Sequence, residues 1–269
     1  MDIKVFQKFR EIVYENSGIS LNETKEAMVS SRISKRMRIL GIDDYKRYLQ
    51  YLLDDKTGDE ITKFLDVIST NVTSFFRENE HFEFLGELIS AWVAQGKKKV
   101  RIWSAAASTG EEPYSIAMTI LLAAGTQAAD MRILATDIST KALTTAREGV
   151  YSDTALSNVP DSLKDRFFLH KKNDNQTIYI AKEYLRRMIV YKRLNLAKPP
   201  FPMRGQIDVV LCRNVMIYFD RTIRARLVAE IYRLLNPGGY LMTGHAESLT
   251  SLKTDFICLR PSIYQKSDA

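Results

Sequence analysis

The segment that most constrains the fold of this chain runs from Val100 to Tyr114 and reads VRIWSAAASTGEEPY. It begins with an apolar, β-favouring run, and residues 104–110 carry no side chain larger than threonine, so a ligand could approach the backbone closely. Pro113 suits the first turn of a helix, where a missing N–H has no cost. In open α/β sheets such a strand-to-helix crevice binds nucleotide-like ligands. The segment therefore predicts a buried strand, a ligand-binding turn and a helix start, although an ordinary βα turn shares this pattern.

The residues of this turn narrow the class of ligand. The turn lacks both the Gly-Lys-Ser/Thr ending of a Walker loop and the spacing of a dinucleotide-binding glycine motif. Glu111 and Glu112 follow at the expected helix start, where two carboxylates would repel a phosphate. They suit the hydroxyl groups and the positive charge of a ligand such as S-adenosylmethionine.

The composition is that of an ordinary globular protein, with 45% hydrophobic and 26% charged residues in a chain of 269. The longest apolar stretch, 116–124, is far shorter than the ~20 residues of a membrane span, and no secretory signal is visible, so we expect a cytoplasmic protein. Cys212 and Cys258 lie in strand-like surroundings, which predicts buried, reduced thiols. The three histidines show no ligand spacing, so we expect no metal.

The chain divides into a helical first part and an α/β second part. Residues 1–70 contain no proline and repeat apolar residues at helical spacing, which predicts a small helical domain. Residues 71–98 read as a linker and a connecting helix, and from 99 to 269 strand-like and helical runs alternate. This alternation predicts an α/β domain with a parallel sheet covered by helices on both faces. We also expect an inserted antiparallel β-element at about 160–187, turning at residues 173–175, and a closing antiparallel pair near the C-terminal end. Residues 236–239, Asn-Pro-Gly-Gly, are expected to form a turn that ends a helix before the strand at 240–243.

Polar side chains follow two of the expected strands. Asp137 ends the second strand, where an acid can accept both hydroxyls of a ribose, although a strand-end cap would look the same. Asn214 and Tyr218 follow the strand at 207–213, so we expect their polar side chains to lie at the crevice. Tyr218 alone would read equally well as a core aromatic residue.

Four segments together resemble the CheR family of chemotaxis receptor methyltransferases. They are STNVTSFFR at 69–77, WSAAASTGEEPYS at 103–115, CRNVMIYFD at 212–220 and GHAES at 244–248. The resemblance spans nearly the whole chain, and four long motifs in this order are far more specific than any one of them. It implies an all-α N-terminal domain followed by a Rossmann-like class I S-adenosylmethionine-dependent methyltransferase domain.

The same resemblance implies the residues of the site. It places cofactor contacts in the linker, in the small-residue turn and after the second, third and fourth strands, at Asn71, Thr73, Arg77, Glu111, Asp137, Asn195, Leu196, Arg213 and Asn214. The residues themselves already favour Glu111, Asp137 and Asn214. The linker residues alone would read as a helix cap and a solvated arginine.

The resemblance also implies a partner, the cytoplasmic domain of methyl-accepting chemotaxis receptors. It assigns receptor docking to the second helix, whose basic residues have no acid near them in sequence and are Arg32, Lys35, Arg36 and Arg38. Without the resemblance, a solvated helix face would be the better interpretation. Some members grip a receptor pentapeptide through a glycine-rich loop in the β-element. Residues 171–176 contain no glycine, so we do not expect tethering through that pentapeptide.

We therefore expect a monomeric enzyme that makes glutamyl methyl esters on chemoreceptors and releases S-adenosylhomocysteine. Arg77 and Tyr218 are expected to orient the reacting carboxylate, because both can donate hydrogen bonds. Two alternatives remain at this point. One is a non-catalytic S-adenosylmethionine-binding regulator that docks on receptors. The other is an RNA methyltransferase, suggested by the net charge of +7, although the basic run lacks the interleaved aromatic residues that nucleic-acid binding favours.

Overall fold

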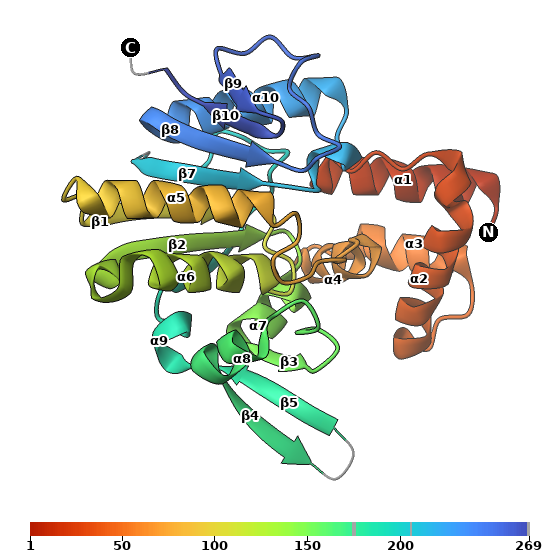
Figure 1. Cartoon of the computed structure of the whole chain (residues 1–269). Coiled ribbons are helices and arrows are strands. Elements are labelled where there is room, and N and C mark those ends of the chain that lie inside the picture. Colours follow the sequence, from red (N-terminus) through yellow and green to blue (C-terminus); the bar gives the residue numbers. More distant parts are fainter. Residues whose placement is uncertain (174–175, 205, 268–269) are drawn as a thin grey trace.

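The computed structural model describes residues 1–173, 176–204 and 206–267, which form a helical domain and a larger α/β domain (Figure 1). The helical domain has its own core, in which the rings of Phe9, Tyr48 and Phe64 lie 5.6 to 6.4 Å apart. Gly18 and Gly41 end its first two α-helices with left-handed backbone. The helices of this domain are α1 (Ile3–Ser17), the short 3-10 helix η1 (Glu23–Lys25), α2 (Glu26–Leu40), α3 (Tyr45–Asp54) and α4 (Asp59–Ile68).

The α/β domain is built on a seven-stranded sheet with the strand order β6-β2-β1-β7-β8-β10-β9. Neighbours from β6 to β8 are parallel, and β9 and β10 form the predicted closing antiparallel pair. β10 also pairs antiparallel with β8, which joins this pair to the sheet. The order reverses between β1 and β7, which is where open α/β sheets bind ligands. The strands are β1 (Lys99–Ser104), β2 (Asp130–Asp137), β6 (Ile189–Arg193), β7 (Ile207–Cys212), β8 (Leu235–Thr243), β9 (Ile257–Arg260) and β10 (Ile263–Gln265).

Helices cover both faces of this sheet. Alternate residues of β7 enter two different cores: Val209 and Leu211 pack in the one shared with α5 and α6, and Val210 and Cys212 in the one shared with α10. Burial on both faces explains why β7 is apolar almost throughout. The helices are α5 (Glu80–Ala94), α6 (Glu111–Ala124) with the 3-10 helix η2 (Gly125–Ala129), α7 (Thr140–Glu148) and α10 (Arg221–Leu234), which follows the 3-10 helix η3 (Met216–Tyr218). This arrangement confirms the predicted fold class.

A small antiparallel sheet projects from the α/β domain with the strand order β3-β5-β4 (Figure 1). Strands β4 (Phe168–Asn173) and β5 (Gln176–Ala181) are the predicted hairpin, although residues 174–175 of its expected turn lie outside the described residues. Strand β3 (Val150–Ser152) lies before the predicted bounds of the insert, and three residues are too few for a period-2 pattern. Helices α8 (Asp161–Phe167) and α9 (Glu183–Arg186) flank the hairpin.

Two local predictions are wrong. Both cysteines are free thiols, but only Cys212 is buried; Cys258 is exposed because β9 is the edge strand, none of whose residues is buried. Residues 236–239, expected to form a turn, belong to β8, where an irregular register with β7 accommodates Pro237. None of the helices in the described part of the chain is long and apolar enough to cross a membrane.

Candidate active site

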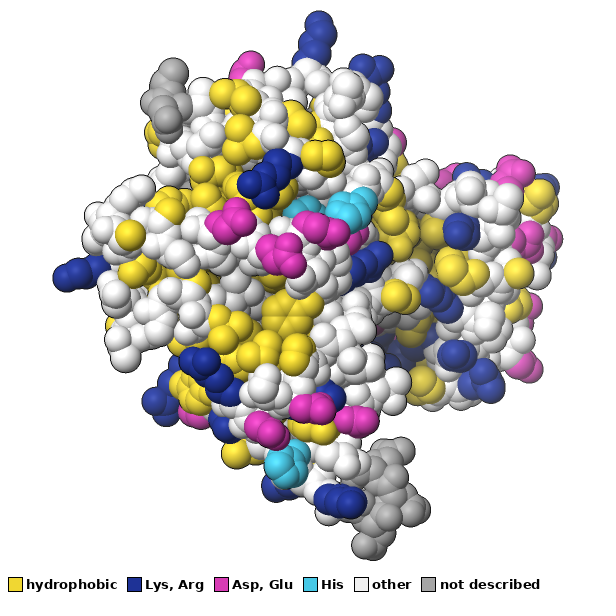
Figure 2. All heavy atoms as spheres, viewed as in Figure 1, with side chains coloured by type: hydrophobic (Ala, Val, Ile, Leu, Met, Phe, Trp, Pro, Cys, Tyr) yellow, Lys and Arg dark blue, Asp and Glu magenta, His cyan; other side chains and the backbone are white. Residues whose placement is uncertain are grey.

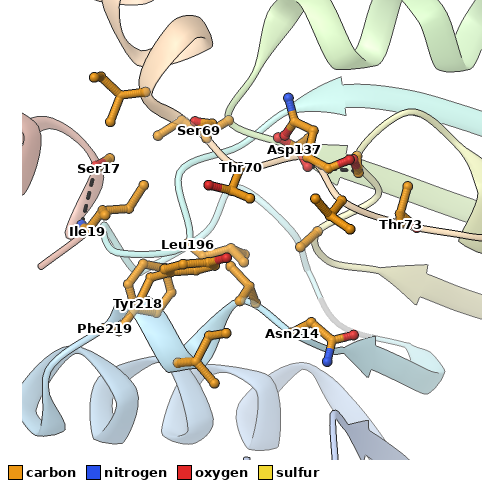
Figure 3. Close-up of a pocket in the computed structure, with 18 of the residues that line it drawn as sticks. Ser17, Ile19, Ser69, Thr70, Thr73, Asp137, Leu196, Asn214, Tyr218 and Phe219 are labelled. Carbon is orange, nitrogen blue, oxygen red and sulfur yellow. Dashed lines mark hydrogen bonds between the residues drawn. The ribbon is translucent and has the colours of Figure 1, made fainter. Parts of the chain in front are cut away.

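A cavity of about 510 Å³ lies between the helical domain and the carboxyl ends of the parallel strands (Figure 3). One wall comes from the α1–α2 connection, from α2 itself and from the linker at 69–77. The other walls come from the turn after β1 and from the segments after β2, β6 and β7. The cavity therefore lies where the strand order reverses, and the helical domain covers what would otherwise be an open crevice.

The turn after β1 approaches its neighbours too closely for larger residues. Gly110 has a φ of 102°, and a Cβ at this position would lie 2.6 Å from the hydroxyl oxygen of Tyr151. Two residues earlier, the backbone N–H of Ser108 donates to Asp137 at 2.8 Å. The small-residue turn predicted from the sequence is thus held against the second strand, with Ala105, Ala106 and Ser108 in the cavity wall.

Asp137 ends β2 with its carboxylate fixed by the backbone. One oxygen accepts from Ser108 N at 2.8 Å and the other from Ser139 N at 2.9 Å. Burial raises the pKa of Asp137, although these backbone donors oppose the shift. Figure 3 shows Asp137 on the opposite side of the cavity from Tyr218. A carboxylate held in this way can use its remaining lone pairs to accept ligand hydroxyl groups.

A buried ion-pair network joins the linker to the sheet through Arg213, which is only 5% exposed. Its guanidinium contacts Glu112 at 2.9 Å and Glu78 at 3.0 Å, and donates to the backbone carbonyl of Arg77. Burial raises the pKa of Glu112 despite the nearby Arg213. For Glu78 burial is the largest single effect and raises the pKa, but the charge of Arg213 and the hydrogen bonds from Asn214 and Arg213 together outweigh it, so the pKa is lowered. Arg213 therefore lines the cavity and also fixes the linker that covers it.

The two adjacent glutamates of the small-residue turn differ in position. The resemblance implies a cofactor contact at Glu111, but its carboxylate accepts a hydrogen bond from the Thr109 hydroxyl at 2.7 Å. Among the described residues, it is Glu112 and not Glu111 that lines the cavity. The sequence did not favour Glu112 over Glu111, because Arg213, its ion-pair partner, is distant in sequence.

The linker residues Asn71, Thr73 and Arg77 all line the cavity, as the resemblance implies. Phe75 anchors the linker in the core, where its ring packs edge-on against Tyr151 at 5.0 Å between centroids. Arg77 bends back along the linker, since its Nη1 donates to the carbonyl of Val72 at 3.1 Å. The other N–H groups of its half-buried guanidinium can donate hydrogen bonds to a ligand.

The other predicted residues line the opposite wall, and several also join the two domains. Asn195 donates from its side chain to the carbonyl of Asn16 at 2.7 Å, and the carbonyl of Tyr218 accepts from Ser20 N at 2.8 Å. Asn214 has a φ of 57°, and its backbone N–H donates to Glu247 at 2.6 Å. Leu196, Asn214 and Tyr218 complete the wall (Figure 3).

The charge of the basic run on α2 is partly neutralised inside the protein by an acid that is distant in sequence, although no acid lies near the run in sequence. Arg36 makes two hydrogen bonds, of 2.9 and 2.5 Å, to Glu60, which is 3% exposed and also accepts from the Tyr48 hydroxyl.

Arg32 donates to the backbone carbonyls of Ile68 and Ser69 and lines the cavity. Lys35 and Arg38 are exposed, and Figure 2 shows further basic side chains across the helical domain. The docking role of the run stays a prediction.

Two of the three histidines meet in space although they are far apart in sequence. His81 and His245 lie with ring centroids 5.6 Å apart, and each offers a ligand atom within 4.8 Å of the carboxylate of Glu78. Figure 2 shows histidine side chains beside acidic ones on this face. Burial lowers the pKa of His81 to about 4, so its imidazole is uncharged at neutral pH. The sequence spacing of the histidines gives no sign of this cluster, which only the fold brings together.

Protein families and individual known proteins match most of the chain. Residues 4–69 match the family described as "CheR methyltransferase, all-alpha domain", and residues 71–264 match "CheR methyltransferase, SAM binding domain". A protein named "Chemotaxis protein methyltransferase 2" from Pseudomonas aeruginosa is 41% identical over 90% of this chain and 86% of its own length. "Chemotaxis protein methyltransferase" from Salmonella typhimurium is 34% identical over 97% and 90%, respectively. The protein of that name from Borreliella burgdorferi is 36% identical over 96% and 92%.

Proposed function

Because this chain belongs to the CheR family of methyltransferases, we propose that it methylates glutamate side chains on the cytoplasmic helices of bacterial chemoreceptors, using S-adenosylmethionine. The products are glutamyl methyl esters and S-adenosylhomocysteine. The observation that carries the proposal is the cavity at the strand-order reversal, which Asp137, Arg77 and Tyr218 line together.

The residues of the cavity fit the cofactor. A volume of about 510 Å³ is within the roughly 300–1,000 Å³ typical of small-molecule sites. Asp137 is positioned to accept ribose hydroxyl groups, and the small residues after β1 allow close approach to the backbone. When bound, S-adenosylmethionine supplies a methyl group on a positively charged sulfur. The buried network of Glu112, Glu78 and Arg213 carries one net negative charge beside the cavity, which favours this positive charge.

The acceptor needs little activation. A glutamate carboxylate has a reference pKa near ~4.3, so it is ionised at neutral pH and needs no strong general base. The task of the protein is to orient this anion and exclude water. Arg77 and Tyr218 line the cavity and can donate hydrogen bonds to the carboxylate, and the linker at 69–77 forms part of the wall around it.

We extend the proposal to the setting of the reaction. The chain acts as a monomer in the cytoplasm, on a receptor partner and not on nucleic acid. Docking uses the exposed basic residues of α2, which suit a helical bundle bearing glutamates. The receptor C-terminal pentapeptide contributes little, because the connection between β4 and β5 lacks glycine.

A labelling experiment tests this function. The protein is incubated with S-adenosylmethionine carrying a radioactive methyl group, and with either receptor-containing membranes or RNA. We expect label on the receptor that mild base releases as methanol, since carboxyl methyl esters are base-labile. Label on RNA, base-stable label on the receptor, or cofactor binding without any transfer would each contradict the proposal.

A further inference from the structure

Glu78, His81 and His245 form a cluster beside the cofactor cavity whose chemistry the methyltransferase reaction does not use. Each offers a ligand atom, and these atoms lie within 4.8 Å of one another. The Nδ1 atom of His81 is 3.6 Å from the carboxylate of Glu78. Two imidazoles and a carboxylate are a ligand set that suits Zn²⁺.

The environment of His81 gives a second, independent reason to expect a ligand. This side chain is 1% exposed, and within the described ranges neither of its ring nitrogens has a hydrogen-bond partner. Buried polar side chains nearly always have a partner, so two unpaired nitrogens on one ring call for an explanation. His245 is half exposed, with 55% of its side chain accessible, so an ion could enter from solvent on that side.

The charges around the cluster also favour a dication. Arg213 shares the carboxylate of Glu78 but is balanced by Glu112, so these three groups together carry one negative charge. Glu80 adds another, with its carboxylate 3.9 Å from the Nε2 atom of His245. Because each carboxylate oxygen has two lone pairs, Glu78 could bind a metal without losing Arg213.

We propose that Glu78, His81 and His245 bind one Zn²⁺ ion, with water or Glu80 in the fourth position. Zinc takes nitrogen ligands at about 2.0–2.1 Å, so the three side chains must close around the ion from their present separation. His245 supplies most of this movement, because its side chain is exposed whereas His81 is packed.

The proposed zinc site adjoins the cofactor cavity. Glu78 contacts Arg213 at 3.0 Å and the side-chain amide of Asn214 at 3.2 Å, and both residues line the cavity. An ion bound to Glu78 would therefore share this carboxylate with two residues of the cavity wall.

Equilibrium binding of Zn²⁺ alone, measured by competition with a chromophoric chelator, tests the site. The full chain should bind one ion, and His245→Ala should weaken binding by more than about tenfold, the least that losing even an outer partner of a ligand costs. His170→Ala is the matched control, because His170 is exposed on β4 and distant from the cluster in the fold. Cys258→Ser controls for the exposed thiol.

The expected result is that both control variants bind Zn²⁺ like the natural sequence. Absence of a stoichiometric site in the natural sequence, or equal binding by His245→Ala, would overturn the proposal. The visible absorption spectrum of bound Co²⁺ gives a second readout, since a tetrahedral site with nitrogen ligands should lose its spectrum in His245→Ala. Neither measurement involves methyl transfer, so the outcome is independent of the proposed reaction.

Discussion

The cavity at the carboxyl edge of the sheet and helix α2 both contain residues that the family resemblance singles out, yet these residues have different surroundings in the fold. At the cavity, Asp137 and Asn214 follow different strands and still line one space. On α2, Lys35 and Arg38 are exposed, whereas Arg36 is bound to the buried Glu60 of α4. Parallel strands bring their carboxyl ends to one edge of a sheet, so the position of a residue in the chain predicts its place in the site. A helix offers no such rule for the partner of a charged residue.

The largest effect that separates the two regions is expected at Arg36. The substitution Arg36→Ala leaves Glu60 buried without its cation, which should destabilise the protein by about 3–5 kcal/mol. Arg38→Ala, on the same helix but exposed, should change stability by no more than about 0.5 kcal/mol. Denaturant unfolding of both variants measures the difference. Equal unfolding midpoints would show that the ion pair does not stabilise the helical domain.

At the cavity, Arg77→Lys should affect the reaction more than the fold. Lysine lacks the planar fork of arginine and cannot both bond the Val72 carbonyl and orient a carboxylate. We expect kcat/KM for methyl transfer to fall by at least about tenfold, or ~1.4 kcal/mol, with little change in Tm. Initial rates with receptor membranes, together with thermal unfolding, provide the comparison. Unchanged rates would remove Arg77 from the reacting site.

The adjacent glutamates of the turn provide a matched pair. Glu112→Gln removes a buried negative charge from the cavity wall and should weaken S-adenosylhomocysteine binding roughly fivefold, about 1 kcal/mol. Glu111→Gln should leave the affinity unchanged, because this carboxylate bonds Thr109 outside the cavity wall. Calorimetric titration of both variants measures this difference. A larger loss in Glu111→Gln would favour the contact that the resemblance implies.

The smallest effect is expected for the exposed charges of α2. Lys35→Glu and Arg38→Glu should each raise the Michaelis constant for receptor by a factor of about two to five at low salt, and less at high salt. Cofactor affinity should not change, because neither side chain lines the cavity within the described residues. Methylation rates at several receptor concentrations and ionic strengths measure both parameters. If deleting the receptor pentapeptide had the greater effect, docking would lie elsewhere.

The sequence predicted the α/β architecture because strand periodicity, the small-residue turn and Pro113 are all local signals. It also favoured Asp137 and Asn214, because strand ends have a defined place in such a fold. It could not predict that Arg36 pairs with Glu60, since that contact depends on how α2 packs against α4.

Two other features of the site could not be predicted from the sequence either. Which of the adjacent residues Glu111 and Glu112 lines the cavity depends on a shift of one position along the helix and on the contact with Arg213. Arg213 lies 101 residues after Glu112 in the chain. The meeting of His81 with His245 depends on how the loop after β8 packs against α5, so their sequence spacing indicates nothing.

The most direct test of the account is the affinity of S-adenosylhomocysteine for Asp137→Asn, measured by calorimetric titration beside the natural sequence. The central claim is that the cofactor lies at the carboxyl edge of the sheet with its ribose on the fixed carboxylate of Asp137. Asparagine cannot make the same charge-assisted bonds, so we expect affinity to fall by ~1.5–3 kcal/mol, roughly ten- to a hundredfold. Because Asp137 also accepts from Ser108 N and Ser139 N, Tm is measured in parallel and the affinity is compared at a temperature where both proteins are folded. An affinity equal to that of the natural sequence would contradict the claim.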